Sequence, residues 1–231
     1  MENIQIHDTI RDIKSQFRLF MNGVISQSMR EKGMGYKLNF GIEYPRIKEI
    51  AQRYPKDHQL AQALWKENIR ECKIMATLLQ PVDTFYPEIA EIWVEDMQYP
   101  ELAEYAVMNL FQYLPYASES AFCWMADGRE YFQLCGFLLM ARLLMKKMIA
   151  EAEQRGLPVE INAYGVAEFA EQVGHYQVVL LGPQVKYMQQ DLQKQADKYG
   201  IRVEPINMMD YGMQKGAAVL DFALSLIENK N

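Results

Sequence analysis

The chain has 231 residues, half of them hydrophobic, and a formal net charge of −6, which allows one large domain or two small ones. The most apolar stretch, residues 134–145, is interrupted by Arg142 and is too short to span a bilayer. The N-terminus carries charge from its second residue and has no apolar signal-peptide core, so we expect a cytoplasmic protein without membrane insertion. Three cysteines and three histidines without zinc spacing predict no metal site and no cofactor.

Charge is distributed unevenly along the chain. Residues 1–73 hold 13 Lys or Arg and 9 Asp or Glu, whereas residues 74–128 hold 9 Asp or Glu and no cation at all. Residues 129–231 are nearly balanced. Because nucleic-acid binding depends on clustered cations that neutralise phosphates, only the first third of the chain is a candidate for that contact.

Residues 1–149 predict helices throughout, because segments with a 3.6-residue apolar period alternate with proline- and glycine-containing loops. Three segments begin with Tyr-Pro, namely "YPRIKEIAQR", "YPEIAEIWVE" and "YPELAEYAVMN", and a first-turn proline is a good helix start. The last two begin 13 residues apart, as successive antiparallel helices of a helical solenoid would. The three tryptophans lie on apolar helix faces and are predicted to be core residues.

After residue 149 the pattern changes, and Gly156 and Pro158 predict the end of a helix. Residues 159–164, 176–182 and 201–207 are predicted strands that alternate with helices over 167–173, 185–200 and 216–230. Such alternation favours βαβ units with parallel strands. We therefore predict a mainly α chain: a HEAT-like α-solenoid over residues 1–149, then a small α/β domain over residues 150–231 with a three-stranded, mostly parallel sheet.

The N-terminal two-thirds resembles the DNA alkylation repair family of HEAT-like proteins, through stretches such as "LAQALWKENIRECKIMATLLQP" and "EIAEIWVEDMQYPELAEYAVMNLF". The resemblance implies an α-solenoid whose concave basic face holds duplex DNA. It also implies base excision by an aspartate beside tryptophans, with an arginine near the DNA backbone. Here Glu104 stands at the position of the acid, Pro100 at that of a tryptophan, and Gln133 and Leu134 at those of two arginines.

We therefore expect weak or absent base excision, with Glu104 as the candidate catalytic acid. The candidate phosphate contacts, which form either a DNA-binding surface or an ordinary solvated face, are Arg30, Lys32, Tyr36, Lys37, Arg46, Lys48 and Arg53.

The C-terminal third resembles the IIB component of the lactose/cellobiose branch of the sugar phosphotransferase system, through "VEINAY" and "VVLLGPQVKYMQQDLQKQADKYGIRVEPINMMDYG". In that family a cysteine after the first strand receives a phosphoryl group, which a backbone loop cradles. A gapless match places Cys135 at this position, whereas Cys123 lies too far from the following helix. The segment after Cys135, "GFLLMARL", suits a buried helix, so Cys135 is either a phosphocysteine or a packing residue.

The resemblance also implies a central first strand that this sequence lacks. Strands 159–164 and 176–182 then pair directly, or another chain supplies a strand, or the domain is only marginally folded; we expect direct pairing. Because the two resemblances meet in one helix, we expect the chain to be a fusion, natural or artificial, that is joined in that helix. Its function is predicted as a DNA-repair-like repeat protein that binds duplex DNA or protein partners, with a IIB-type phosphocarrier or a non-catalytic scaffold as alternatives. Its oligomeric state stays open.

Overall fold

The computed structural model describes residues 3–228. The chain forms two compact units, residues 1–120 with 126–135, and residues 121–125 with 136–231. The division passes through a single 25-residue helix, Glu130–Gln154, between Cys135 and Gly136. A domain boundary at residue 149, as predicted from the sequence, stays a prediction.

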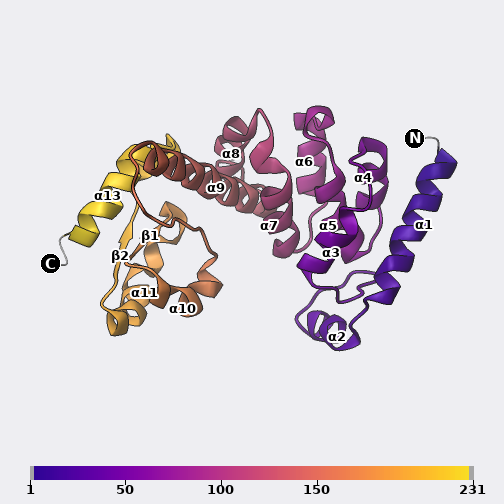
Figure 1. Cartoon of the computed structure of the whole chain (residues 1–231), viewed down its shortest axis with the longest axis horizontal. Helices are drawn as coiled ribbons and strands as arrows, with labels where there is room; N and C mark the ends of the chain where they lie inside the picture. Colours follow the sequence, from indigo (N-terminus) through magenta and orange to yellow (C-terminus); the bar gives the residue numbers. More distant parts are fainter. Residues whose placement is uncertain (1–2, 229–231) are drawn as a thin grey trace. The chain divides into compact units, whose positions relative to one another are not determined.

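The first unit is a HEAT-like stack of short helices, and Figure 1 shows α3 to α7 packed side by side. Proline in the first turn starts three of these helices, as the Tyr-Pro motifs predicted. The helices are α1 (Asn3–Leu19), α2 (Gly23–Glu31), α3 (Tyr44–Ala51), α4 (His58–Trp65), α5 (Arg70–Leu79), η1 (Val82–Thr84), α6 (Pro87–Glu95), α7 (Pro100–Asn109) and η2 (Phe111–Tyr113). Two more, α8 (Ala117–Met125) and α9 (Glu130–Gln154), have residues in both units.

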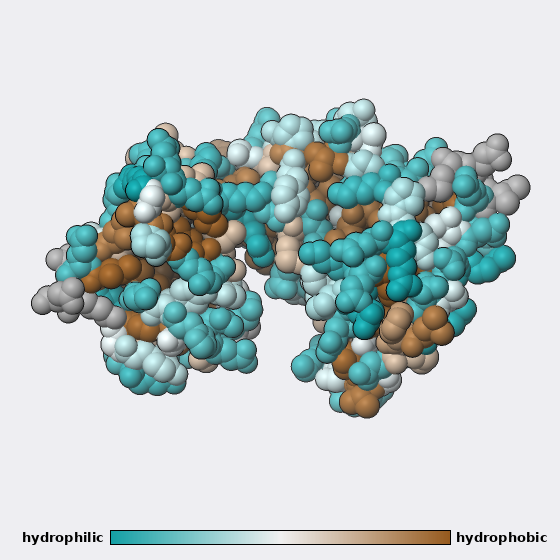
Figure 2. Space-filling model, viewed as in Figure 1, coloured by the Kyte–Doolittle hydropathy of each residue, from teal (hydrophilic) through white to brown (hydrophobic). Residues whose placement is uncertain are grey.

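Helix α5 is the centre of the first unit. Nine of its ten residues are buried, and it packs against α3, α4 and α7. By contrast, α2 buries none of its residues. Exposed apolar side chains gather around α2 and the end of α1 (Figure 2), and they belong to Leu19, Met21 and Val24.

The second unit is a small α/β fold. Its remaining elements are η3 (Val166–Glu168), α10 (Phe169–Gln172), η4 (Val173–His175), β1 (Val178–Leu181), η5 (Pro183–Met188), α11 (Gln189–Ala196), η6 (Asp197–Tyr199), β2 (Arg202–Pro205), α12 (Met208–Gly212) and α13 (Gly216–Glu228). Strands β1 and β2 run parallel, with Val179 opposite Val203. Their core consists of Phe169, Val173, Leu181, Leu192, Ala196, Ile201 and Val203.

The prediction of a third strand over residues 159–164 is wrong, because the described sheet has two strands. Residues 159–164 form neither helix nor strand. Side chains hold this segment instead: Asn162 donates to the Tyr176 hydroxyl at 2.7 Å, and the Tyr164 hydroxyl lies 2.9 Å from the same group. An alternating pattern makes a strand only where a neighbouring backbone completes the ladder, and none lies beside it here.

Helix α9 ends where the sequence predicted. Gly156 adopts a left-handed backbone with φ of +66°, which glycine accepts without strain. The amide of Leu157 then donates back to the carbonyl of Ala152 at 2.9 Å. The segment "CGFLLMARLLMKKM" is therefore continuous helix from its first residue to its last.

Candidate functional site

The predicted phosphate-contacting cations lie around α2, the loop over residues 32–43, and α3. All six are exposed. Arg46 pairs with Glu49 and its guanidinium lies 4.6 Å from the centre of the Phe20 ring, and Arg53 donates to Gln16. In the part of the chain that the structure describes, no ion pair neutralises the other four, Arg30, Lys32, Lys37 and Lys48. These four form the unneutralised cation set of the first unit.

Tyr36 does not lie at the surface with these cations. Only 6% of it is exposed, and its ring packs against Tyr99 with centroids 4.5 Å apart. Burial, followed by the nearby Glu101 carboxylate, raises the pKa of the Tyr36 phenol, so the hydroxyl stays protonated at neutral pH. The structure therefore places the predicted tyrosine in the interior, with its hydroxyl available as a donor.

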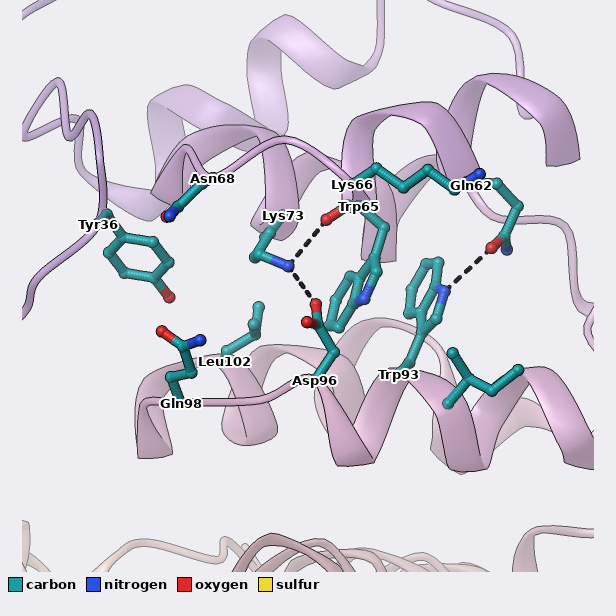
Figure 3. Close-up of a pocket in the computed structure, with 11 residues that line it drawn as sticks. Tyr36, Gln62, Trp65, Lys66, Asn68, Lys73, Trp93, Asp96, Gln98 and Leu102 are labelled. Carbon is teal, nitrogen blue, oxygen red and sulfur yellow. Dashed lines mark hydrogen bonds and ion pairs between the residues drawn. The ribbon is translucent and has the colours of Figure 1, made fainter.

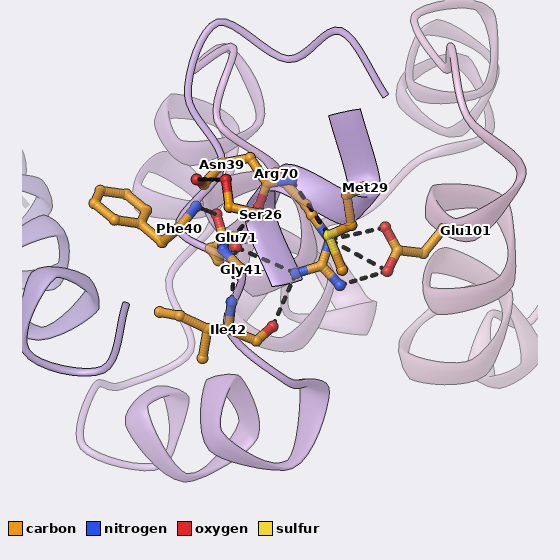
Figure 4. Close-up of polar contacts among 9 residues, drawn as sticks. All are labelled: Ser26, Met29, Asn39, Phe40, Gly41, Ile42, Arg70, Glu71 and Glu101. Atoms are coloured by element: carbon orange, nitrogen blue, oxygen red, sulfur yellow. Dashed lines mark hydrogen bonds and ion pairs between the residues drawn. The ribbon is translucent and has the colours of Figure 1, made fainter. Parts of the chain in front are cut away.

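A buried ionic network holds the cationic loop against α5 (Figure 4). The Glu71 carboxylate accepts hydrogen bonds from the amides of Phe40 (3.1 Å) and Ile42 (3.3 Å). Arg70 donates to the Ile42 carbonyl at 2.9 Å and forks onto Glu101 of α7, with Nε 2.9 Å from one carboxylate oxygen. Arg70 is 2% exposed and Glu71 fully buried. The network thus fixes the backbone at Phe40 and Ile42, which follow Lys37 in the same loop.

Gly41 lets this loop pass close to α2. Its φ is +69°, and a Cβ there would lie 2.2 Å from the carbonyl oxygen of Asn22. The neighbouring Asn39 side chain accepts from the Gly41 amide at 2.7 Å, and the backbone carbonyl of Asn39 accepts from the Ser26 hydroxyl at 2.7 Å. A side chain at residue 41 would push α2 and its cations away from the loop.

A cavity of about 390 Å³ opens between the ends of α4 and α6 (Figure 3). Its wall contains Trp65 and Trp93, stacked with centroids 4.0 Å apart and planes 3° apart. Lys73 closes the other face of Trp65: its ammonium lies 4.7 Å from the ring centre, 2.8 Å from the Trp65 carbonyl and 2.5 Å from Asp96. The edge of Phe85 packs against Trp93.

This arrangement makes the tryptophan pair a closed stack. Trp65 is 4% exposed and Trp93 1%, which confirms the prediction that they are core residues. The Trp93 indole donates to Gln62, whereas the indole N–H of Trp65 has no hydrogen-bond partner among the described residues. No ring face is left open for a further base to stack on. Tyr36, Asn68 and Gln98 also line the cavity.

Glu104, the candidate acid, is exposed on α7. The same helix directs Glu101 toward Arg70 and stacks Tyr105 on Tyr44, with centroids 4.6 Å apart. Pro100 is the first residue of α7, where its fixed φ favours the start of the helix. Glu104 is not among the residues that line the cavity, so the structure does not bring the candidate acid and the tryptophan pair into one site.

Cys135 lies inside α9 and is fully buried. Its thiol donates to the Met97 sulfur at 3.7 Å, and burial raises the pKa of the thiol to about 12. Backbone N–H groups in a helix interior bond within the helix, so none is free to cradle a phosphoryl group. Cys123 is exposed on α8, and Cys72 is buried in α5.

The second unit has a cleft of about 510 Å³ where β1 and β2 end. The carboxyl ends of parallel strands are a common ligand position in α/β folds. Lys186, Asn207 and Asp210 supply polar groups, and Ile206, Val219 and Phe222 supply apolar ones. The adjoining helix α12 also exposes methionines, a feature that the run "NMMDYGM" could have signalled: Met208 at 76%, Met209 at 66% and Met213, just beyond it, at 63%.

Residues 3–228 contain neither a membrane-crossing helix nor a metal-binding cluster. No helix in this range is long and apolar enough to cross a membrane. No group of three or more His, Cys, Asp or Glu side chains in the same range is placed to hold a metal ion.

Comparison with known proteins finds two family matches that overlap in α9. A model of DNA alkylation repair enzymes matches residues 13–157, and one of the lactose/cellobiose-specific IIB subunit of the phosphotransferase system matches residues 135–222. The oligo-beta-mannoside-specific EIIB component of Bacillus subtilis is 40% identical over 96 residues, which is 42% of this chain and 93% of that protein. The galactose-specific EIIB component of Lactococcus lactis is 34% identical over 98 residues, which is 40% of this chain and 91% of that protein.

Proposed function

Because the chain belongs to the DNA alkylation repair enzyme family over residues 13–157 and to the lactose/cellobiose IIB family over residues 135–222, we propose that its helical repeat unit binds duplex DNA with weak or no base excision. The IIB-like part is then an appended module that binds other proteins.

The unneutralised cation set carries the proposal for DNA binding. Arg30, Lys32, Lys37 and Lys48 are exposed, and none of them forms an ion pair with a carboxylate among the described residues. The Arg70–Glu71 network holds the loop at Phe40 and Ile42, and the amide of Lys37 donates to the Asn68 side chain at 3.2 Å. A fixed set of cations binds phosphates at a lower entropic cost than a mobile one. We expect weak excision for two reasons. The stack of Trp65 and Trp93 is closed, and Glu104, the candidate acid, does not line the cavity beside these tryptophans.

Binding of a fluorescently labelled duplex, measured between about 25 and 200 mM salt, tests this proposal. We expect affinity to fall steeply with salt. The double variant Lys32→Ser, Lys37→Ser should lower the log–log slope by about 0.9 for each phosphate that is no longer neutralised. Lys186→Ser in the second unit is the matched control and should leave the slope unchanged. No binding at the lowest salt concentration, or equal slopes for all variants, contradicts the proposal.

For Cys135 we propose a packing role. Similarity to EIIB components favours a phosphocarrier, but the thiolate is the nucleophilic form and a pKa of about 12 makes it rare at neutral pH. Incubation with a phosphorylated IIA protein, followed by mass spectrometry of the cysteine peptides, distinguishes the two. We expect an unmodified thiol. A phosphorylated Cys135 would contradict the packing role and support a phosphocarrier function.

Protein partners are proposed at the IIB-like part. Exposed methionines such as Met208 and Met209 form an adaptable apolar surface beside the cleft where the strands end. A pull-down with the double variant Met208→Ser, Met209→Ser as the comparison tests this. Partners that the variant retains in full would contradict docking at this surface.

A further inference from the structure

The outer edge of strand β2 is closed by side chains of α11. Gln193 accepts a hydrogen bond from the amide of Val203 at 2.8 Å, and Gln189 donates to the Val203 carbonyl at 3.0 Å. Gln193 also donates to the Ile201 carbonyl at 2.9 Å. Both polar groups that Val203 directs away from β1 are therefore satisfied, and no further strand can join the sheet on this side.

The outer edge of β1 has no such protection. The Leu181 carbonyl accepts from Ile206 at 2.9 Å, so Leu181 faces β2, and by the alternation of a parallel ladder Val179 does too. Val178 and Leu180 then direct their N–H and C=O groups to the outer edge. Among the described residues, no hydrogen bond to these four groups is present. Figure 1 shows no third strand beside β1.

This open edge leaves the isolated chain with unpaired backbone groups. In a half-buried strand such as β1, N–H and C=O groups that have no protein partner depend on water for their hydrogen bonds. A two-stranded sheet is also marginal by itself. Strand β1 has the sequence "VVLL", which is β-prone and uncharged, so it carries none of the charges that protect other exposed edges.

We propose that the outer edge of β1 binds an extended strand, and that the occupant is β1 of a second copy of this chain. Two identical edges related by a two-fold axis pair antiparallel, each donor meeting an acceptor, to give a four-stranded sheet with β2 of each copy outermost. No charge lies between Val178 and Leu181, so the pairing brings no like charges together. A ladder of four residues buries little area, and the dimer is correspondingly weak and reversible.

Amide hydrogen exchange of the whole, unmodified chain tests this proposal directly. The amides of Val179 and Leu181 lie inside the existing ladder and should be protected at every protein concentration. Those of Val178 and Leu180 should exchange freely in dilute protein and gain at least about tenfold protection in concentrated protein, in parallel with dimer mass by sedimentation. Protection of all four amides in dilute protein, or exchange that is independent of concentration, overturns the proposal.

Val178→Pro removes one outward N–H from each copy, at the first residue of the strand, where proline is tolerated. We expect self-association to weaken at least about tenfold. Val178→Thr keeps the amide and the branched side chain, and should dimerise as the wild-type chain does. If Val178→Pro dimerises equally well, another surface is responsible and the proposal fails. If that variant does not fold, the exchange experiment on the wild-type chain still decides.

Discussion

Glu71 is the residue on which the cationic loop depends most directly. Its carboxylate is fully buried, accepts two backbone hydrogen bonds and neutralises part of the Arg70 charge. We expect Glu71→Ala to destabilise the first unit by about 3–5 kcal/mol. The substitution leaves two buried amides without their acceptor and removes one of the two carboxylates that pair with the buried Arg70 guanidinium.

Urea unfolding followed by tryptophan fluorescence measures this loss of stability, since Trp65 and Trp93 belong to the same unit. Glu49→Ala is the matched control, because Glu49 is an exposed carboxylate paired with Arg46, and it should cost less than about 1 kcal/mol. Equal effects of the two substitutions would show that the buried network does not hold the loop.

Cys135 offers a test based on pH. Burial raises the pKa of its thiol to about 12, so the folded chain holds this proton more tightly than the unfolded chain, whose thiols titrate near about 8.5. The ionisation of this thiol therefore leaves the free energy of unfolding unchanged at neutral pH. It lowers that free energy as the pH rises above about 8.5, the pKa in the unfolded chain. One such thiol costs about 1.4 kcal/mol at a pH of about 9.5.

Stability curves at pH values from about 7 to 9.5, for the wild-type chain and for Cys135→Ala, isolate the contribution of this thiol. The variant should lose less stability over the range, by about 1 kcal/mol or more. Parallel curves would mean that Cys135 ionises as it does in the unfolded chain. That result would support a role for Cys135 as a nucleophile.

Among the elements, α9 shows how a glycine can be required inside a helix. A Cβ at Gly136 would lie 2.5 Å from the backbone nitrogen of Met125 in α8. Alanine usually favours a helix over glycine by about 1 kcal/mol. Here we expect Gly136→Ala to destabilise by about 1–3 kcal/mol, because α8 must move.

Thermal unfolding of Gly136→Ala beside Gly212→Ala checks this, since nothing lies within 4 Å of a Cβ at Gly212 of α12. The control should be neutral or slightly stabilised. A stabilised Gly136→Ala would show that α8 and α9 do not pack as closely as described.

The sequence predicted the elements whose signals are local. The Tyr-Pro starts of α3, α6 and α7, the glycine at the end of α9, the apolar strand β1 and the strand β2 all lie where expected. The prediction of a strand over residues 159–164 was wrong, because alternation describes a strand only if a partner is present. The Arg70–Glu71 network could not be predicted, since its partners lie about 30 residues away in either direction.

In the candidate site, too, features with a local signal could be predicted and features that depend on tertiary contacts could not. Exposure of Arg30, Lys32, Lys37 and Lys48 follows from their charge and could be expected. The burial of Tyr36 against Tyr99, and the closing of Trp65 by Lys73, depend on tertiary contacts between residues far apart in the sequence. No pattern of spacing along one chain indicates such contacts.

At the scale of the whole molecule, the uneven charge should set how DNA affinity responds to salt. Helix α6 presents Glu88, Glu91 and Glu95 to solvent, in a stretch of 55 residues that has no cation. These carboxylates belong to the same unit as the unneutralised cation set and repel a phosphate backbone that approaches it. Such repulsion acts over roughly 10 Å at about 0.1 M salt and further in dilute salt.

We therefore expect Glu88→Gln with Glu91→Gln to raise duplex affinity about two- to fivefold at about 20 mM salt and to have no effect at about 300 mM. The gain comes from a lower repulsion and adds no phosphate contact. Glu171→Gln, an exposed carboxylate of the second unit, is the control and should change neither value. If the double variant raised affinity equally at both salt concentrations, α6 would contact the DNA directly, and the binding surface would have to extend beyond the cations of the first third.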